Sequence, residues 1–257
     1  MKILFHLHGK GIYDVSKKEE KYYRYAFNNE CVICLANSLC NDISKVYKGV
    51  PYVLNNGVED NLKLEKEVIC KSNDGKIRVL FLSNFLISKG IFDMLHIAKN
   101  ISKTRSNVEF VMIGQYTKEV TEEHLRQKIK EAELSEFINL IGPLFTKEKF
   151  YIIKQCDIFL FPTHNEAFGN VLLETMQYYI PSIASNEGGI PDIVEDGVTG
   201  FLCEKKNISD FTEKLDKLIS DDVLRVQMGR NARTRFEQRF TLDKFEQNLL
   251  TIIDEVV

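Results

Sequence analysis

Continuous apolar runs recur at regular intervals through the C-terminal two thirds of the chain. Each run is bounded by glycine, proline or polar residues, and the segments between the runs repeat apolar positions at helical spacing. The runs predict strands at residues 77–82, 108–113, 137–141, 158–161, 181–184 and 200–203. Because apolar strands that alternate with helices are typical of a parallel sheet covered on both faces, we expect an α/β domain over residues 77–240.

The first 56 residues carry a shorter version of the same pattern. They predict strands at 2–7, 31–36 and 52–54 and helices at 17–28 and 39–47. Asn37 and Ser38 precede the second helix and are typical N-caps. Two or three strands are too few for a complete doubly wound domain, so residues 1–56 are interpreted as part of one. Residues 57–76 are interpreted as a linker, and residues 241–257 as a helix that packs back towards the N-terminal part.

The composition is that of an ordinary globular protein. Of the 257 residues, 44% are hydrophobic and 28% are charged, and the formal net charge is −3. This balance gives no electrostatic footprint for nucleic acid or for an anionic membrane surface. No run of 18 apolar residues predicts a spanning helix. We therefore expect a cytoplasmic protein, and peripheral association with the inner face of the membrane stays open.

A Cys-x-x-Cys pair, Cys31 and Cys34, lies on one of the expected strands. Positions three apart on a strand point to opposite faces, and no second cysteine pair has the spacing of zinc ligands. We interpret the cysteines as core residues of a protein in a reducing cytosol. A metal or redox site is the alternative.

A polar turn follows the predicted strand at 158–161. It contains Glu166 and Gly169 and leads into a helix with Glu174, and seven residues separate the two glutamates. A glycine turn between a strand and a helix presents backbone N–H groups to an anion. A phosphate bound there would have one carboxylate on each side, which matches the order of sugar, pyrophosphate and ribose in a nucleotide sugar. On these residues alone, glutamates that face solvent in an ordinary turn remain the alternative.

Three further turns are expected at the same edge of the sheet, where the strands end and ligands of such sheets bind. The first contains Ser83 and Asn84 and ends with Lys89 before a glycine, which places an ammonium group to meet an anion; a solvated surface lysine is the alternative. The others are Gly142-Pro143 and a second glycine turn that opens a helix at 188–192.

Together these motifs resemble the donor-binding half of the family 4 glycosyltransferases (group 1 glycosyl transferases), which have the GT-B fold. The resemblance is carried by Glu166-Ala-Phe-Gly-Asn-Val-Leu-Leu-Glu174 and by Gly188-Gly-Ile-Pro-Asp-Ile-Val-Glu-Asp-Gly-Val-Thr-Gly-Phe-Leu202. Shorter matches occur at 88–90, 141–143, 156–162 and 180–185, and the likeness covers about residues 50–250. It implies an α/β protein of GT-B type, with a Rossmann-like C-terminal donor domain and a partial N-terminal Rossmann-like domain on the acceptor side.

The resemblance also implies a role for each matching residue. Glu174 would bind the ribose hydroxyls, Glu166 would contact the donor sugar near the reacting carbon, and Lys89 would meet the pyrophosphate. The other donor-binding residues would be Ser83, Asn84, Gly142, Pro143, Phe168, Gly169, Asn170 and Val171. Members of the family retain the anomeric configuration and need no divalent metal, and no Asp-x-Asp occurs in this chain. No metal or other cofactor is therefore expected.

Two features depart from the family's pattern. An arginine is usual at the position of Asn84, so the pyrophosphate would be held less tightly there or by a hydrogen bond from the amide. The first half of the acceptor domain has no counterpart, so the chain is interpreted as truncated at its N-terminus. The family's active-site histidine corresponds to His8, with a bystander role as the alternative, and His6 is expected on the opposite face of the strand.

These residues predict a retaining glycosyltransferase with Glu166, His8 and Lys89 as catalytic residues. It would move a sugar from a UDP- or GDP-linked donor to a glycan or lipid-linked acceptor, in surface polysaccharide biosynthesis. One alternative is a catalytically incompetent module that only binds nucleotide sugars. A further alternative is a nucleotide-sugar epimerase of the same fold.

Overall fold

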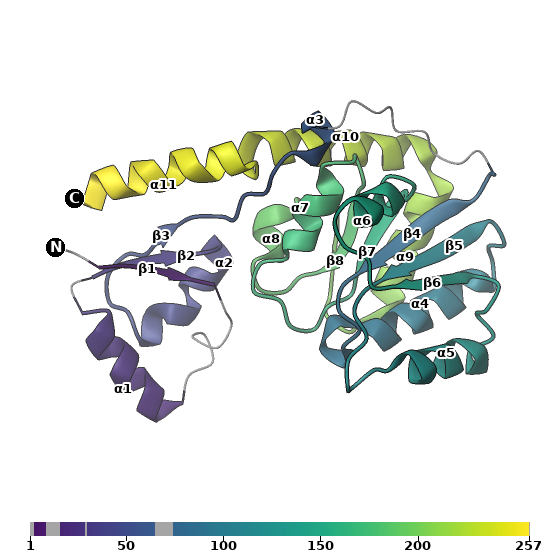
Figure 1. The fold of residues 1–257 in the computed structure, drawn as a ribbon, viewed down its shortest axis with the longest axis horizontal. Coiled ribbons are helices and arrows are strands. Elements are labelled where there is room, and N and C mark those ends of the chain that lie inside the picture. Colours follow the sequence, from purple (N-terminus) through teal and green to yellow (C-terminus); the bar gives the residue numbers. More distant parts are fainter. Residues whose placement is uncertain (1–2, 9–15, 29, 65–73, 257) are drawn as a thin grey trace.

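The computed structural model describes residues 3–8, 16–28, 30–64 and 74–256, and these form two units (Figure 1). The larger unit contains a broad sheet with helices on both faces. The smaller unit contains the N-terminal residues, and the last helix of the chain lies along it.

A six-stranded sheet forms the centre of the larger unit. Its strand order is β6-β5-β4-β7-β8-β9, and every neighbouring pair is parallel. The strands are β4 (Ile77–Leu82), β5 (Val108–Ile113), β6 (Ile138–Gly142), β7 (Ile158–Phe161), β8 (Ser182–Ser185) and β9 (Gly200–Cys203). Each lies within one residue of its predicted bounds, so the expected parallel sheet is confirmed. The order reverses between β4 and β7, which is where ligands of open α/β sheets bind.

Alternate side chains of each strand enter two separate layers of the core. On β4, Val79 and Phe81 face one layer, and Leu80 and Leu82 face the other. The first layer is covered by α4 (Ile91–Ser102), α5 (Glu122–Glu131) and α9 (Ile208–Ser220). The second is covered by α6 (Thr146–Ile153), α7 (Asn170–Met176), α8 (Ile190–Ile193) and α10 (Asp222–Arg239). None of the helices in the described ranges is long and apolar enough to cross a membrane.

The smaller unit has a three-stranded parallel sheet of order β1-β2-β3. The strands are β1 (Leu4–Leu7), β2 (Cys31–Cys34) and β3 (Tyr52–Val53). Between the first two runs α1 (Lys17–Ala26), which begins with a capping box formed by Ser16 and Glu19.

The single helix predicted at 39–47 is wrong in two respects. The segment divides into α2 (Asn37–Cys40) and the 3₁₀ helix η2 (Asp42–Lys45). Asn41 and an aspartate meet at the break, and such residues are poor in helix interiors. Asn37 and Ser38 are also not side-chain N-caps, because α2 begins after Ala36 without a side-chain cap of its own.

The cysteines of β2 lie on opposite faces of the strand, as expected. Cys31 packs with Ile252 of the last helix, and Cys34 packs on the side of Phe27. The five cysteines within the described residues form no disulfide. Their places in the hydrophobic clusters favour the interpretation as core residues, and Cys70 lies outside the described residues.

The chain crosses between the units at two neighbouring points. Val58 donates its N–H to the carbonyl of Phe240, and Leu242 donates to the carbonyl of Val58, both at 3.0 Å. Helix α11 (Leu242–Val256) then lies along the smaller sheet (Figure 1), with Phe245 and Ile252 against Ile33 and Leu54. A Cβ on Gly57 would come within 2.5 Å of the Thr241 carbonyl oxygen, so only glycine allows the two crossings to lie so close.

The segment interpreted as a linker is fixed to the larger unit at its start. It contains α3 (Asn61–Leu64), and Asp60 beside this helix forms an ion pair with Arg233 of α10, with an Nη2–Oδ2 distance of 2.7 Å. Arg233 also donates to the carbonyl of Gln177 at 3.1 Å. The two charged side chains are 10% and 5% exposed, so this is a buried pair that anchors residues 58–64.

Candidate active site

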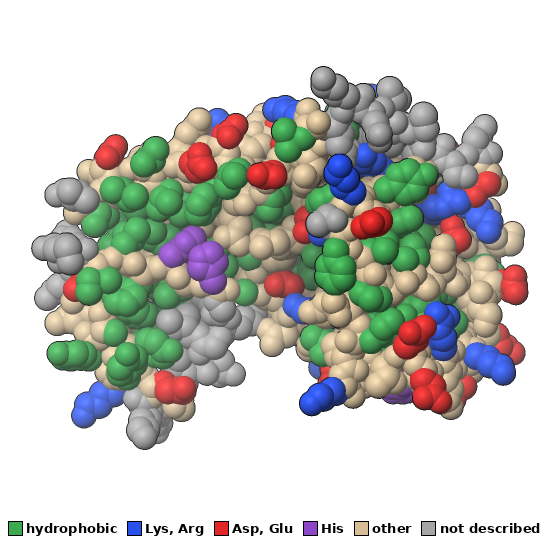
Figure 2. Space-filling model, in the orientation of Figure 1, with side chains coloured by type: hydrophobic (Ala, Val, Ile, Leu, Met, Phe, Trp, Pro, Cys, Tyr) green, Lys and Arg blue, Asp and Glu red, His purple; other side chains and the backbone are tan. Residues whose placement is uncertain are grey.

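A cleft of about 480 Å³ opens at the carboxyl ends of β4 and β7, where the strand order reverses. It lies between the two units, in the hollow that Figure 2 shows near the centre of the molecule. Three strands contribute their last residues to its wall: Leu82, Ile113 and Phe161. The smaller unit contributes His8, Leu35 and Asn56.

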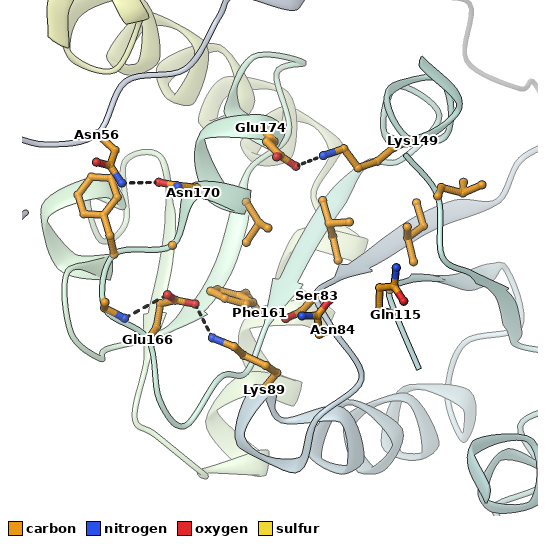
Figure 3. A pocket seen from close by; sticks show the side chains of 18 of the residues that line it. Asn56, Ser83, Asn84, Lys89, Gln115, Lys149, Phe161, Glu166, Asn170 and Glu174 are labelled. Carbon is orange, nitrogen blue, oxygen red and sulfur yellow. Dashed lines mark hydrogen bonds and ion pairs between the residues drawn. The ribbon is translucent and has the colours of Figure 1, made fainter. Parts of the chain in front are cut away.

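Glu166 and Lys89 meet at one end of the cleft (Figure 3). Lys89 Nζ lies 2.9 Å from Glu166 Oε2 and 3.1 Å from the carbonyl oxygen of Asn165. The other carboxylate oxygen of Glu166 accepts the N–H of Ala167 at 3.1 Å. The side chains of Lys89 and Glu166 are 23% and 16% exposed, so this pair faces the cleft from a largely desolvated position.

The loop of Glu166 and the turn of Lys89 are held together by the backbone. Lys89 ends a 3₁₀ turn, Ile87–Lys89, and the next residue, Gly90, has a φ of 72°. A Cβ at Gly90 would lie 1.9 Å from the carbonyl oxygen of Pro162. His164 donates its N–H to the Ser88 carbonyl at 2.8 Å. Glycine is therefore required for the close approach that brings the ammonium to the carboxylate.

Glu174 and Lys149 meet at the opposite end of the cleft, with 2.9 Å between Lys149 Nζ and Glu174 Oε2 (Figure 3). Glu174 lies on α7, about one turn after its start, and Lys149 lies on α6. The ammonium also lies 4.9 Å from the ring centroid of Phe150. Of the four charged side chains that line the cleft, two are lysines and two are glutamates.

The start of α7 lies between the two ion pairs. Gly169 precedes the helix with a φ of 102°, a conformation that favours glycine, and Asn170 is the first helical residue. Asn170 Oδ1 accepts a hydrogen bond from Asn56 Nδ2 of the smaller unit at 2.9 Å. The first N–H groups of a helix have no partners within it, so this turn presents donors to the cleft.

Most of the residues implied by the resemblance lie together in the cleft. Besides the two glutamates and Lys89, the lining includes Ser83, Asn84, Pro143, Phe168, Gly169, Asn170 and Val171. Gly142 is not among the lining residues. It takes a φ of 88° and accepts the Gly114 N–H at 3.0 Å, so its role is to form the turn that presents Pro143.

Several lining residues were not predicted: Asn56, Gln115, Leu144, Phe145 and Lys149 among them. Lys149 carried a usable signal, because the first turn of a helix that follows an edge turn lies near that edge. Asn56 carried none, since it reaches the cleft only through the crossing of the chain between the units.

His8, the residue after β1, lines the cleft, but the expected position of His6 on the opposite face is wrong. His8 Nε2 lies 3.0 Å from His6 Nδ1, and the ring centroids are 4.1 Å apart. Residues two apart on a strand share a face, which explains the contact. Burial, and then the neighbouring His8, lower the pKa of His6 below its ordinary value.

Within the described residues, no three His, Cys, Asp or Glu side chains lie close enough together to hold a metal ion. The cleft offers ammonium groups, amides and backbone N–H groups as donors, with two carboxylates as acceptors. This set suits a ligand that carries both negative charge and hydroxyl groups.

A family model described as glycosyl transferases group 1 matches residues 63–235. The match covers nearly all of the larger unit and includes both glutamates and both lysines of the cleft.

Curated relatives agree with the family model. The chain is 31% identical over 185 residues to CapM of Staphylococcus aureus, a capsular polysaccharide biosynthesis glycosyltransferase. This alignment covers 71% of this chain and 47% of CapM. It is 27% identical over 253 residues to MJ1178 of Methanocaldococcus jannaschii, an uncharacterized glycosyltransferase, which covers 97% of this chain and 67% of that protein. The chain thus spans about half to two thirds of the length of these relatives.

The fold is similar to that of HepE from Anabaena, which was solved in complex with UDP and glucose. The TM-score is 0.78 at 19% sequence identity, and the match covers 98% of this chain and 71% of that one. The likeness extends over both units and confirms the expected GT-B type of fold.

Proposed function

The chain belongs to the group 1 glycosyl transferases, and from this membership we propose that its cleft binds a nucleotide-diphosphate sugar and transfers the sugar to an acceptor. The observation that carries the proposal is the pair of carboxylate–lysine contacts at the two ends of the cleft, Glu166–Lys89 and Glu174–Lys149, with the start of α7 between them. A donor has the same order of groups: sugar, diphosphate, ribose.

The ribose end of the donor would lie at Glu174. The carboxylate would accept hydrogen bonds from the ribose hydroxyls, and Lys149 would offset the carboxylate's charge beside a polyanionic ligand. Glu174 accepts from Lys149 through one oxygen, at 2.9 Å, so its second oxygen is available to a ribose hydroxyl.

The diphosphate would lie at the start of α7. The N–H groups of Gly169, Asn170 and Val171 would donate to phosphate oxygens, with Lys89 and the amide of Asn84 beside them. As the bond between the anomeric carbon and the diphosphate breaks, negative charge grows on the leaving group. Fixed N–H donors and an ammonium stabilise that charge more in the transition state than in the bound donor, which lowers the barrier.

The sugar would lie between Glu166 and His8. Glu166 is fixed by Lys89 and by the Ala167 N–H, so it is oriented before the donor binds. His8 reaches the cleft from the other unit, on the side where an acceptor would approach. We propose that the transfer retains the anomeric configuration and needs no divalent metal, so EDTA should leave the rate unchanged.

The name of CapM supports an acceptor in surface polysaccharide assembly. We propose a glycan or lipid-linked acceptor, a UDP- or GDP-linked donor, and a reaction in the cytoplasm or at the inner face of the membrane. Two alternatives remain as competing outcomes: a module that binds nucleotide sugars without turnover, and an epimerase of the same fold.

Product analysis separates these functions. The protein is incubated with UDP- and GDP-sugars, with and without glycan acceptors, and the products are resolved by mass spectrometry and sugar chromatography. Release of nucleoside diphosphate with transfer or hydrolysis of the sugar is the expected result, and it should be lost in Glu166→Ala. Binding without any product over the whole panel would replace the proposal with the binding module, and a new sugar isomer would replace it with the epimerase.

A further inference from the structure

A short segment of the larger unit, Gly188–Asp192, lies between the smaller unit and the loop of Glu166. It consists of the glycine turn and the first residues of α8. Its contacts on the two sides are distinct: one side bonds to α2 and the other to the Glu166 loop.

The first contact joins Asp192 to the start of α2. The carboxylate accepts the N–H of Asn37 at 2.7 Å and the N–H of Ser38 at 3.3 Å. It also accepts the side-chain amide of Asn37 at 2.9 Å. Because α2 has no side-chain cap of its own, the aspartate of the other unit performs that role from more than 150 residues away.

A second bond reinforces this contact. Ser38 Oγ donates to the carbonyl of Gly188 at 2.7 Å. Both ends of the Gly188–Asp192 segment are therefore bonded to Ser38, and the Asp192 end is also bonded to Asn37.

The other side of the segment touches the Glu166 loop. Gly189 donates its N–H to the carbonyl of Ala167 at 2.8 Å. Gly188 has a φ of 54°, and a Cβ there would lie 1.9 Å from the carbonyl oxygen of Glu166. A Cβ on Gly189 would meet both the Ala167 carbonyl oxygen, at 2.8 Å, and the Cβ of Ala36, at 3.0 Å. Three segments from different parts of the chain thus meet at two glycines.

The segment itself is fixed to the larger unit by α10. Arg235 donates to the carbonyl of Asp192 at 3.0 Å and to the carbonyl of Ile193 at 2.8 Å. Its remaining guanidinium nitrogen pairs with Glu195 at 2.9 Å. Because Arg235 keeps the segment in place, separation of the smaller unit from it must break the bonds of Asp192 and Gly188 to α2. The bond between Asn56 and Asn170 must break as well.

We propose that Asp192 is a positioning residue that couples two features of the molecule. One is the position of the smaller unit in which α2 is bonded to the larger unit, and the other is the order of the Glu166 loop. The inference rests on the proposed function, in which Glu166 meets the donor sugar. While α2 is bonded to Asp192 and Gly188, the glycine turn is held against the Glu166 and Ala167 carbonyls, and His8 is held at the opposite side of the cleft. When α2 separates from Asp192 and Gly188, the Glu166 loop and His8 both become less ordered. By linkage, a ligand that orders the Glu166 loop also favours the position of the smaller unit in which α2 is bonded to Asp192 and Gly188.

Hydrogen–deuterium exchange on the ligand-free protein tests the coupling directly. In Asp192→Ala, exchange should accelerate at least threefold in peptides from residues 36–46 and also from residues 164–170. Glu195→Gln is the matched control, because it removes a neighbouring carboxylate charge that pairs with Arg235 and has no hydrogen bond or ion pair to α2 or the Glu166 loop within the described residues. Both segments should keep the wild-type rate. Acceleration limited to residues 36–46, or equal changes in the control, would overturn the coupling.

Two further variants separate positioning from general damage. Asp192→Asn keeps one carbonyl oxygen as an acceptor and should give an intermediate rate in both segments. Ser38→Ala removes only the bond to Gly188, and it should accelerate the same two segments even if Asp192→Ala proves unstable. No change at residues 164–170 in either variant counts against the proposal.

UDP distinguishes a failure of this inference from a failure of the proposed function. In the wild type, UDP should slow exchange at residues 164–170 and at residues 36–46, whereas in Asp192→Ala the slowing should be confined to the cleft. If UDP slows exchange at residues 164–170 but not at residues 36–46, the coupling is refuted and the donor site stands. If UDP changes nothing, the donor site is refuted, and the ligand-free comparison alone decides the coupling.

Discussion

At the scale of residues, the cleft is characterised by charges that are already paired without a ligand. Glu166 and Glu174 follow a strand ending and Lys89 follows another, so the order of strands and turns was enough to predict that they share an edge. Lys149 and Asn56 reach the cleft through packing between elements, which no local pattern encodes. The placement of His6, in contrast, can be predicted from a local pattern. Residues two apart on a strand share a face, so strand alternation puts His6 beside His8.

Replacing Lys149 with methionine should weaken the binding of UDP about tenfold. The variant leaves Glu174 without its cation beside a polyanion, and a hydrogen bond to a charged group contributes about 1.5–3 kcal/mol. The dissociation constant measured by titration calorimetry should also become less sensitive to salt, because the variant lacks one of the positive charges whose attraction to the diphosphate salt weakens. Lys147→Met is the control on the same helix, since Lys147 is exposed and does not line the cleft. Unchanged or tighter binding in Lys149→Met would refute the role.

Because of the contact between His6 and His8, we expect the protein to become less stable as the pH falls. Burial and the neighbouring His8 lower the pKa of His6 from its usual 6.5. Below pH 6.5 the unfolded chain therefore binds a proton more readily than the folded one, and stability declines as the pH falls through that range. Above pH 6.5 both states carry a neutral imidazole and the effect disappears. Melting temperatures between pH 7.5 and 5.5 should fall less for His6→Gln than for the wild type; equal declines would contradict the assignment.

At the scale of elements, apolar periodicity was sufficient for the larger sheet and for the strands and first helix of the smaller unit, but not for the helix predicted at 39–47. Most positions of the central strands β4, β5, β7 and β8 are buried, so these strands appear as largely apolar runs with nearly the observed bounds. The helix predicted at 39–47 is wrong because the segment breaks at Asn41, and because the helix before the break starts at Asn37, where Asp192 of the larger unit caps its first N–H groups. Such a start cannot be recognised from neighbouring residues.

The buried ion pair between α3 and α10 should be important for stability. Asp60→Ala removes a carboxylate that is 10% exposed and leaves the guanidinium of Arg233, at 5% exposure, paired with Glu237, whose side chain is 41% exposed. Loss of one member of a buried pair costs about 3–5 kcal/mol, so urea denaturation should show a decrease of at least about 2 kcal/mol in the free energy of unfolding. Lys63→Met, which removes an exposed partner of the same aspartate, should change it by less than about 1 kcal/mol. Similar small effects in both variants would show that the pair does not anchor the segment.

At the scale of the whole molecule, the protein is two units joined by two adjacent crossings of the chain. The resemblance predicted the type of fold, and the likeness to HepE over 98% of this chain agrees with it. The contacts between the units were not predictable, because Asn37 and Asp192, or Asn56 and Asn170, are separated by more than 110 residues. The contacts that form the cleft between the units are therefore known from the structure and not from the sequence. Our main claim is that this cleft contains a donor site.

The most direct test of that claim is the effect of UDP, GDP and their sugars on the melting temperature. A nucleotide at about 100 times its dissociation constant adds about 2.7 kcal/mol to stability. For a chain of this size, that raises the melting temperature by roughly 5–10 °C. Such a shift is expected in the wild type and in Glu136→Ala, an exposed control, and no shift is expected in Glu174→Ala. No shift in the wild type with any of these nucleotides, or an equal shift in Glu174→Ala, would contradict the claim.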